Sequence, residues 1–240
     1  MSLAERVDEL RRAHGDLCGL ALLRALLIES PLAGRTALVS SFGTESAVLL
    51  DMVARIDRAV PVIFLDTGKL FAETHAHREA LVEALRLRDV RIVEPEASTV
   101  ARYDPHGDLW QHDSDTCCQM RKTEVLEAAL AGFAAWITGR KRFQGGLRWR
   151  LPTIEPEWAT GRIKINPLAP WSAEEVERYR RRRRLPRHPL QERGYRSIGC
   201  IPCTRAVAPG EPQRAGRWDG LGKSECGIHL GCRVVGRERP

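Results

Sequence analysis

The sequence lacks any hydrophobic run that approaches the length needed to cross a bilayer. Its first fifteen residues, MSLAERVDELRRAHG, also lack the basic patch followed by an apolar core that marks an exported protein. No internal repeat is present. The 240 residues, 43% of them hydrophobic, suffice for one substantial α/β domain with a small appendage but not for two full domains. We therefore expect a soluble, unexported, cytoplasmic protein without a membrane partner.

Acidic residues are in the minority, with 31 Asp and Glu against 38 Lys and Arg, which gives a net charge of +7. A basic chain favours anionic partners such as nucleic acid, a nucleotide or an acidic protein surface, and charge alone does not choose among them. The seven cysteines are not expected to form a disulfide framework, because the cytosol keeps thiols reduced. Metal binding or redox chemistry is the leading interpretation.

Strand and helix patterns alternate through the first 150 residues. Residues 1–30 have leucines at helical spacing, and apolar strand patterns then alternate with helical ones. This order predicts an α/β fold with a doubly wound, mostly parallel sheet and a ligand site at the carboxyl ends of its strands. The alternation stops near residue 152, although a helix is expected after Ser172. We divide the chain into a nucleotide-binding α/β domain, 1–199, and a segment with a mobile tail, 200–240, which together form one structural domain. The expected strands lie within 37–40, 59–68, 89–95 and 134–142, with helices from about 44, over 71–88 and from about 117.

Four cysteines fall into two distant pairs. Cys117 and Cys118 are adjacent at the start of an amphipathic helix pattern, and Cys200 and Cys203 form a C-x-x-C unit. A lone cysteine such as Cys18 is simply a small buried hydrophobe, but two pairs indicate one soft-metal site. Structural zinc usually takes spaced pairs of cysteines. Adjacent helical cysteines diverge by about 100°, which suits neighbouring irons of a cubane, so an iron-sulfur cluster is favoured over zinc.

A fifth cysteine, Cys226, lies in the sequence GKSECGIHLGC close to the end of the chain. Lys223, His229, Arg214 and Arg217 are near it in the sequence, and cations of this kind favour a thiolate at neutral pH. We interpret Cys226 as a nucleophile. The alternative is an unremarkable surface thiol in a flexible terminus.

The ordered set CC, SIGCIPCT, EPQRAGRW and ECGIHL resembles the assimilatory adenylylsulfate (APS) reductases, thioredoxin-dependent relatives of the phosphoadenylylsulfate (PAPS) reductases. The resemblance runs from about residue 36 to 230. It implies that Cys117, Cys118, Cys200 and Cys203 hold a [4Fe-4S] cluster. It also implies that Cys226 attacks the sulfur of APS, expels AMP and forms an S-sulfocysteine, from which thioredoxin releases sulfite.

The resemblance further implies a substrate site. Lys122, four residues after Cys118, would lie near the same helix face and offset the cluster's charge, although it could instead be a solvated lysine. A loop arginine is expected as well, and Arg148 is chosen over its competitors Arg140 and Arg150. The loop SSFGTES is similar to a modified pyrophosphatase loop in which Phe42 replaces a glycine, although Gly43 could equally serve only the turn. The expected substrate-binding residues are Ser41, Gly43, Leu65, Thr67, Lys122, Gly139, Arg148, Arg214, Arg217 and His229.

Several alternatives stay open. The chain could use PAPS or both nucleotides, or it could be an ATP-cleaving enzyme that thiolates RNA, although Phe42 and ECGIHL argue against the latter. It could also be a non-catalytic iron-sulfur or zinc module. The arginines within 178–184 suggest nucleic-acid binding, but a solvated helix face is the preferred interpretation, with thioredoxin docking second, and no nucleic-acid partner is expected. Cys232 has no family role; it is a bystander or forms an internal disulfide with Cys226. A homo-oligomer stays open.

Overall fold

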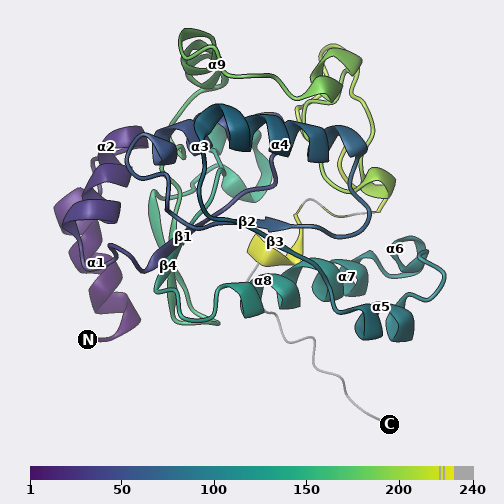
Figure 1. Ribbon diagram of the computed structural model, residues 1–240, viewed down its shortest axis with the longest axis horizontal. Coiled ribbons are helices and arrows are strands. Elements are labelled where there is room, and N and C mark those ends of the chain that lie inside the picture. Colours follow the sequence, from purple (N-terminus) through teal and green to yellow (C-terminus); the bar gives the residue numbers. More distant parts are fainter. Residues whose placement is uncertain (222, 224, 230–240) are drawn as a thin grey trace.

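The computed structural model describes residues 1–221, 223 and 225–229, and Cys232 lies outside them. Its centre is a six-stranded sheet in the order β3-β2-β1-β4-β6-β5 (Figure 1). All neighbours in the sheet are parallel except β5, which is antiparallel to β6. The predicted doubly wound, mostly parallel α/β fold is therefore confirmed. The strands are β1 Thr36–Val39, β2 Val62–Leu65, β3 Val90–Val93, β4 Ala135–Ile137, β5 Ile154–Glu157 and β6 Arg162–Ile165.

The helices connect and flank these strands, and most of them match the expected positions. The helical start of the chain is broken into two helices and a π-helical turn. The α-helices are α1 Leu3–His14, α2 Gly19–Arg24, α3 Ser46–Ala54, α4 Ala72–Leu85, α5 Ala97–Tyr103, α6 Leu109–His112, α7 Ser114–Cys118, α8 Glu124–Ala129 and α9 Ala173–Arg182. The short π and 3-10 turns are η1 Ala25–Glu29, η2 Gln119–Thr123, η3 Arg142–Gln144, η4 Gly146–Arg148, η5 Pro189–Arg193, η6 Ile201–Cys203 and η7 Gly227–His229.

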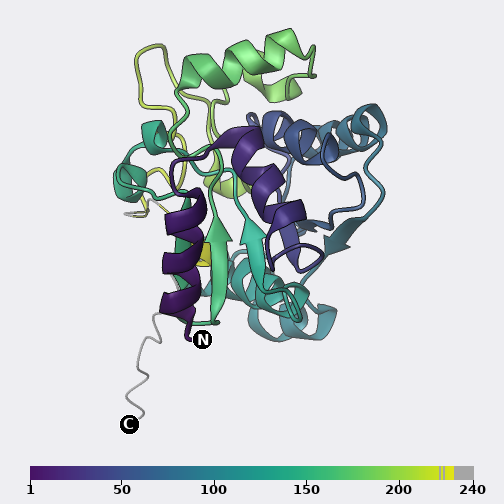
Figure 2. The same cartoon turned by 90° about the vertical axis from the view of Figure 1, so that its left-hand side faces the viewer.

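Each face of the sheet buries its own apolar core, because side chains alternate between the two faces of a strand. Figures 1 and 2 show α3 and α4 on one face and α7 and α8 on the other. In the larger core, side chains from the helices α1, α2, α3, α4 and α9 pack against strand residues such as Leu38, Phe64 and Ile165. The smaller core packs Leu126 and Leu130 on Trp136 and its neighbours, and Ile228 of the C-terminal segment lies against it. The C-terminal segment, by which we mean residues 225–229, thus packs against this face of the sheet through Ile228.

Two features of the fold depart from the expectations. The alternation was expected to stop near residue 152, but β5 and β6 form a hairpin that extends the sheet. The charged residues that hide this pattern are paired, since Lys164 Nζ lies 2.9 Å from a Glu157 carboxylate oxygen. The cysteine-bearing helix is also not continuous. Cys117 and Cys118 end the short helix α7, and the π turn η2 separates them from α8, as π turns often do at functional sites.

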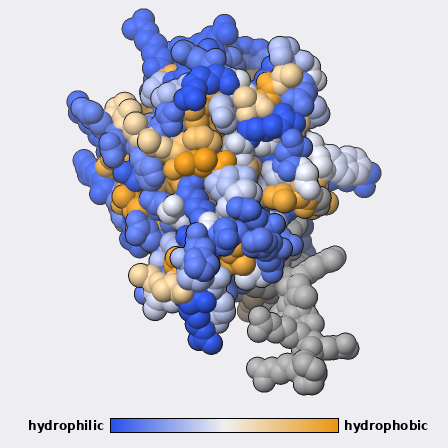
Figure 3. Space-filling model, turned by 90° about the vertical axis from the view of Figure 1, so that its right-hand side faces the viewer, coloured by the Kyte–Doolittle hydropathy of each residue, from blue (hydrophilic) through white to orange (hydrophobic). Residues whose placement is uncertain are grey.

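The arginine-rich helix α9 begins as expected after Ser172, whose side chain and Glu175 form a capping box. Much of its positive charge is neutralised locally, because Glu177 pairs with Arg180, Arg181 and Arg187. This pairing fits the preferred interpretation of a solvated helix face. The face of the molecule in Figure 3 is largely hydrophilic, with smaller hydrophobic areas between the polar side chains. Among the described residues, no helix is both long and apolar enough to span a membrane.

Candidate active site

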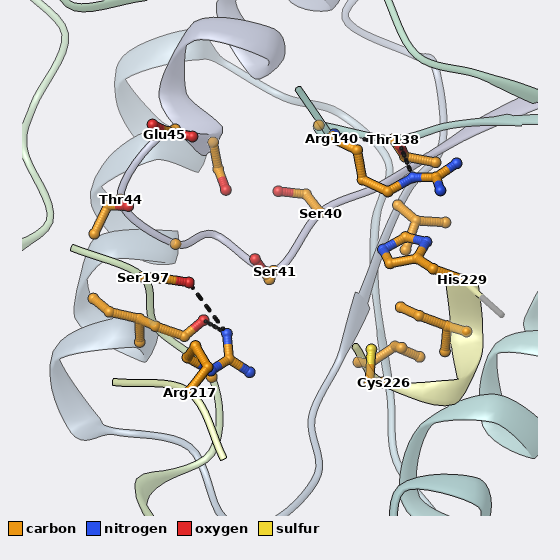
Figure 4. A pocket seen from close by; sticks show the side chains of 18 of the residues that line it. Ser40, Ser41, Thr44, Glu45, Thr138, Arg140, Ser197, Arg217, Cys226 and His229 are labelled. Atoms are coloured by element: carbon orange, nitrogen blue, oxygen red, sulfur yellow. Dashed lines mark hydrogen bonds between the residues drawn. The ribbon is translucent and has the colours of Figure 1, made fainter. Parts of the chain in front are cut away.

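A cavity of about 230 Å³ opens at the carboxyl ends of β1, β2 and β4 (Figure 4). The chain proceeds from β1 to β2 and β3 on one side and then returns to place β4 on the other side of β1. Loops that follow β1 and β4 therefore diverge, and such a switch point leaves a crevice in an open α/β sheet. The C-terminal segment closes the crevice from the opposite side, so that Cys226 and His229 face Ser41 and Arg217 across it.

All of the expected substrate-binding residues line this one cavity, together with Cys226 and Cys200. Of the competing loop arginines, Arg140 and Arg148 line it as well. Arg150 does not, because its guanidinium lies over the exposed Trp149 ring, 4.0 Å from the ring centroid. Sequence positions more than 180 residues apart are thereby brought to one site. The sequence analysis missed several lining residues: Glu45, Lys141, Gln144, Arg196, Ser197, Gln213 and Glu225.

The loop after β1 forms the neutral wall of the cavity. Phe42 has a φ of 46°, a left-handed conformation that costs a side chain other than glycine about 1 kcal/mol. Its ring is fully buried and packs edge-on against Phe64 at 5.4 Å, and its backbone N–H donates to Ser40 Oγ at 3.2 Å. Gly43 does not adopt a positive φ. Gly43 therefore does not provide the left-handed position of this loop, which Phe42 occupies instead.

Glu45, at the end of this loop, is held by three side chains from two separate segments. Lys141 Nζ and Gln144 Nε2 each lie 2.8 Å from its Oε2, and Gln213 Nε2 donates to Oε1 at 2.9 Å. Burial acts to raise the pKa of Glu45, but Lys141 and these donors outweigh it and hold the pKa below the usual range. Because Lys141 is in the basic loop TGRKR, an anionic partner for it was foreseeable, but the identity of that partner was not.

Three further arginines, Arg148, Arg214 and Arg217, also line the cavity. Arg148 and Arg214 both contact Glu225, and burial together with the charge of Arg148 lowers the pKa of Arg214 to about 10. Arg217 donates to the carbonyl of Ile198 at 3.0 Å. The Arg217 guanidinium also passes directly over the backbone of Gly199, where any Cβ would collide with it.

Cys226 lines the same cavity, interacts electrostatically with Arg214 and Arg217, and is half-buried against Trp218, Cys200 and Cys203. His229, three residues later, stacks on Trp136 with ring centroids 6.0 Å apart and an interplanar angle of 9°. Burial, followed by the charges of Arg140 and Arg148, lowers the pKa of His229 well below its usual range. The imidazole is therefore neutral at physiological pH. Its Nδ1 is buried and has no hydrogen-bond partner among the described residues.

The four cysteines of the two distant pairs meet at a second, small cavity, which Lys122 and Arg121 also line. All four are buried. Backbone contacts with the loop after β2 hold the C-x-x-C segment in place. Leu70 and Cys200 form an isolated antiparallel β-bridge, and the Ile201 N–H donates to Lys69 O at 2.8 Å. Within the described part of the chain, no three Cys, His, Asp or Glu side chains gather closely enough to ligate a single ion.

The electrostatic environments of these cysteines differ. Burial raises the pKa of Cys117 to about 11. Burial acts in the same direction on Cys200, but Lys122 and the Thr67 hydroxyl, 3.2 Å from its sulfur, lower its pKa on balance. Burial acts to lower the pKa of Lys122, yet the thiolates of Cys200, Cys226 and Cys118 raise it overall. Lys122 is thus a fixed cation between the cysteine cavity and the larger one, and both cavities have it in their lining.

Comparison with known proteins connects this arrangement to one family. Residues 35–206 match the model of the phosphoadenosine phosphosulfate reductase domain. The adenosine 5'-phosphosulfate reductase of Mesorhizobium japonicum is 53% identical over 194 residues, which cover 81% of this chain and 76% of the relative. The enzyme of the same name from Chelativorans sp. is 46% identical, with 92% of this chain and 90% of the relative covered.

Solved structures give the same result. A phosphoadenylyl-sulfate reductase from Candida auris, in complex with phosphate, superposes with a TM-score of 0.70 and 29% identity and covers 85% of this chain and 97% of its own. The FMN adenylyltransferase of Candida glabrata superposes with a TM-score of 0.53 and 15% identity, covering 94% of this chain and 77% of its own. The second similarity concerns the fold alone.

Proposed function

The chain belongs to the phosphoadenosine phosphosulfate reductase family, and we propose that its substrate is adenosine 5'-phosphosulfate, which it reduces to sulfite and AMP at the expense of thioredoxin. The observation that carries this proposal is the position of Cys226, which lines the cavity together with Arg214, Arg217 and Lys122 and interacts electrostatically with all three. Two relatives that the chain matches over most of its length bear the name adenosine 5'-phosphosulfate reductase.

In the proposed reaction, the Cys226 thiolate attacks the sulfur of the phosphosulfate. A bond forms between Cys226 Sγ and this sulfur while the bond to the bridging oxygen breaks, and AMP leaves with the electron pair. The product is an S-sulfocysteine. A thiolate of thioredoxin then attacks Cys226 Sγ and displaces sulfite, and the second thioredoxin thiol resolves the mixed disulfide. Thioredoxin is oxidised to its disulfide by two electrons, and Cys226 is regenerated.

The cations have a clear part in this reaction, because both the attacking thiolate and the phosphosulfate are anionic. Their approach is unfavourable unless preorganised positive charge faces the developing charge in the transition state. Arg214, Arg217 and Lys122 supply that charge in the cavity that Cys226 lines, and the charge of a Cys226 thiolate contributes to raising the pKa of Lys122. His229, which is neutral, can donate or accept a hydrogen bond but adds no charge.

We further propose that Cys117, Cys118, Cys200 and Cys203 hold a [4Fe-4S] cluster. Four buried thiols that share one cavity but do not converge on a single point fit a cluster with one cysteine for each iron better than a mononuclear tetrahedral zinc site. When bound, the cluster would supply a fixed local charge and a rigid link between α7 and the C-x-x-C segment. Lys122 and Arg121 line the same cavity and would offset the negative charge of the four thiolates.

An assay with protein prepared without oxygen tests the function. With thioredoxin and its reducing system present, APS should yield sulfite and AMP in equal amounts, and PAPS should yield less. Iron and inorganic sulfide should be present at four each for every chain, as a [4Fe-4S] cluster requires. Release of pyrophosphate from ATP, or sulfite from PAPS but not from APS, would contradict the proposal. Zinc in place of iron and sulfide would contradict the cluster.

A further inference from the structure

The cation end of the cavity already contains an anion supplied by the chain. Glu225, the residue before Cys226, is only 6% exposed. Arg148 contacts both of its carboxylate oxygens, through Nε and through Nη2, the latter at 2.7 Å. Arg214 Nη2 lies 3.4 Å from one of the same oxygens. A two-pronged contact of this kind is the geometry in which arginine binds carboxylates and phosphates.

No other carboxylate competes for this position among the described residues that line the cavity. The lining contains two acids, Glu45 and Glu225, and Glu45 is engaged by Lys141, Gln144 and Gln213. Arg140 pairs with Glu155 rather than with Glu225. Among the described residues of the lining, Glu225 is thus the carboxylate that pairs with Arg148 and Arg214.

Glu225 also anchors the segment that carries the nucleophile. Two residues earlier, Lys223 pairs with Asp115 and donates to the carbonyl oxygen of Ser114 at 3.2 Å, both next to the cysteine pair on α7. The chain is thus fixed by one ion pair at Lys223 and by a second at Glu225. Cys226 follows the second anchor directly, so its position in the cavity depends on the arginines that hold Glu225.

We propose that Glu225 is an internal substitute for the anionic group of the substrate, occupying the Arg148 and Arg214 subsite until the nucleotide displaces it. This inference rests on the proposed function, because it identifies the subsite with the position of the phosphosulfate. Binding of substrate then releases the Glu225 anchor. The apparent affinity for any anionic nucleotide is reduced by the fraction of molecules in which Glu225 occupies the subsite.

If Glu225 competes with the substrate, a variant in which residue 225 has no charge but the cavity is otherwise unchanged should bind the substrate more tightly. Glu225→Gln keeps the size of the side chain but removes its charge, so its hold on the two arginines weakens. Binding of APS is measured by calorimetry in a Cys226→Ser background, where no transfer to the protein occurs. We expect APS to bind about tenfold more tightly when Glu225→Gln is added. Adenosine, which has no anionic group, should bind equally to both proteins.

Controls separate this effect from a general change of charge or of fold. Glu211→Gln removes a carboxylate from an exposed pair with Arg205, outside the cavity, and should leave APS binding unchanged. Glu225→Asp retains the charge but is one methylene shorter, so it should strengthen APS binding by less than Glu225→Gln does. A second readout is the alkylation rate of the Cys226 thiol with its native sequence and no nucleotide present, which should rise several-fold in Glu225→Gln because one anchor of the segment is lost.

Each outcome decides a separate claim. If APS binds the Cys226→Ser protein and Glu225→Gln leaves that binding unchanged or weakens it, the internal substitute is refuted while the proposed function stands. If adenosine binding tightens in parallel with APS binding, the effect is not one of displaced charge and the inference is wrong. If the Cys226→Ser protein does not bind APS at all, the proposed function itself fails.

Discussion

The two walls of the cavity differ in what they contribute. The wall built from loops after β1, β2 and β4 is neutral or internally balanced: Phe42 is packed into the core, and Glu45 is matched by Lys141. The opposite wall, built from residues 196–229 together with η2 and η4, contains the thiol of Cys226 and the cations Lys122, Arg148, Arg214 and Arg217. Under the proposed function, the first wall would hold the nucleoside, and the second would hold and transform the anionic group.

This division explains why a fold shared with adenylyltransferases can belong to a reductase family. The FMN adenylyltransferase superposes over 94% of this chain, so the fold as a whole is shared, whereas the thiol and the cations are side chains that residues 196–229, η2 and η4 place in the cavity. Fold and chemistry are thus separable, as is general for function placed on a common fold.

Cys226→Ser should abolish sulfite release, by about a thousandfold or more, because an alcohol is a far weaker nucleophile than a thiolate. AMP binding should change by less than about twofold, since the strand-end wall is untouched. Turnover measures the first effect and calorimetry the second. If AMP binding is lost together with turnover, the two walls do not act separately.

Cys203→Ser should remove the iron and sulfide and lower the free energy of unfolding, because metal binding is coupled to folding. We expect the free energy of unfolding to fall by more than about 3 kcal/mol. The lost cluster ligand belongs to the second wall. Iron content and denaturant unfolding report the two quantities. Cys18→Ser, in the N-terminal helical region and outside both cavities, is the matched control and should retain full iron. Equal iron in the two variants would show that Cys203 is not a ligand.

Gly199→Ala should displace the Arg217 guanidinium, which occupies the space that the new Cβ requires. We expect a loss of about tenfold to a hundredfold in kcat/KM, comparable to that of Arg217→Gln, because a charged hydrogen-bonding group is removed from the anion. The double variant should be no worse than either single one, since residues acting on one interaction are not additive. Additive losses would mean that Gly199 acts through something other than Arg217.

The contact between α4 and the segment after α9, outside both walls, should make stability rather than chemistry depend on pH. Burial lowers the pKa of both His77 and His188 to about 4, and their rings lie 5.0 Å apart between α4 and the segment after α9. Since the unfolded state takes up protons more readily, stability should fall as pH drops from about 6.5 towards 4. For one such histidine the loss is about 2 kcal/mol between pH 7 and pH 5. In denaturant titrations at several pH values, His77→Phe should make the free energy of unfolding depend less steeply on pH. If the dependence is as steep as in the unmodified protein, His77 is not its source.

Much of the fold follows from local sequence patterns. Apolar runs such as PVIFL predict buried parallel strands, and the order of strands and helices predicts the sheet and the edge at which the cavity lies. The β5–β6 hairpin escaped prediction because Lys164 and Glu157 interrupt its apolar pattern, and only pairing across the two strands satisfies their charges. The π turn after Cys118 also has no signal in the local helical periodicity.

The candidate site was predictable in its residue types but not in its pairings. The cysteines and cations could be found because their chemistry is uncommon and their motifs are ordered along the chain. The contact between Glu225 and Arg148 spans 77 residues, and no local pattern encodes it. Phe42 illustrates a different limit, because its left-handed backbone is strained and is offset by burial of its ring against Phe64. Both features depend on tertiary packing, which sequence patterns do not report.

The most direct test of whether Cys226, in the second wall, is the nucleophile is a single-turnover experiment. Protein prepared without oxygen is mixed with one equivalent of APS in the absence of any reductant, then quenched, digested and analysed by mass spectrometry while released AMP is counted. The peptide containing Cys226 should gain one SO3 group for every AMP released, with no gain at the other cysteines. Release of AMP without that adduct, or an adduct at a different residue, would contradict this role of Cys226.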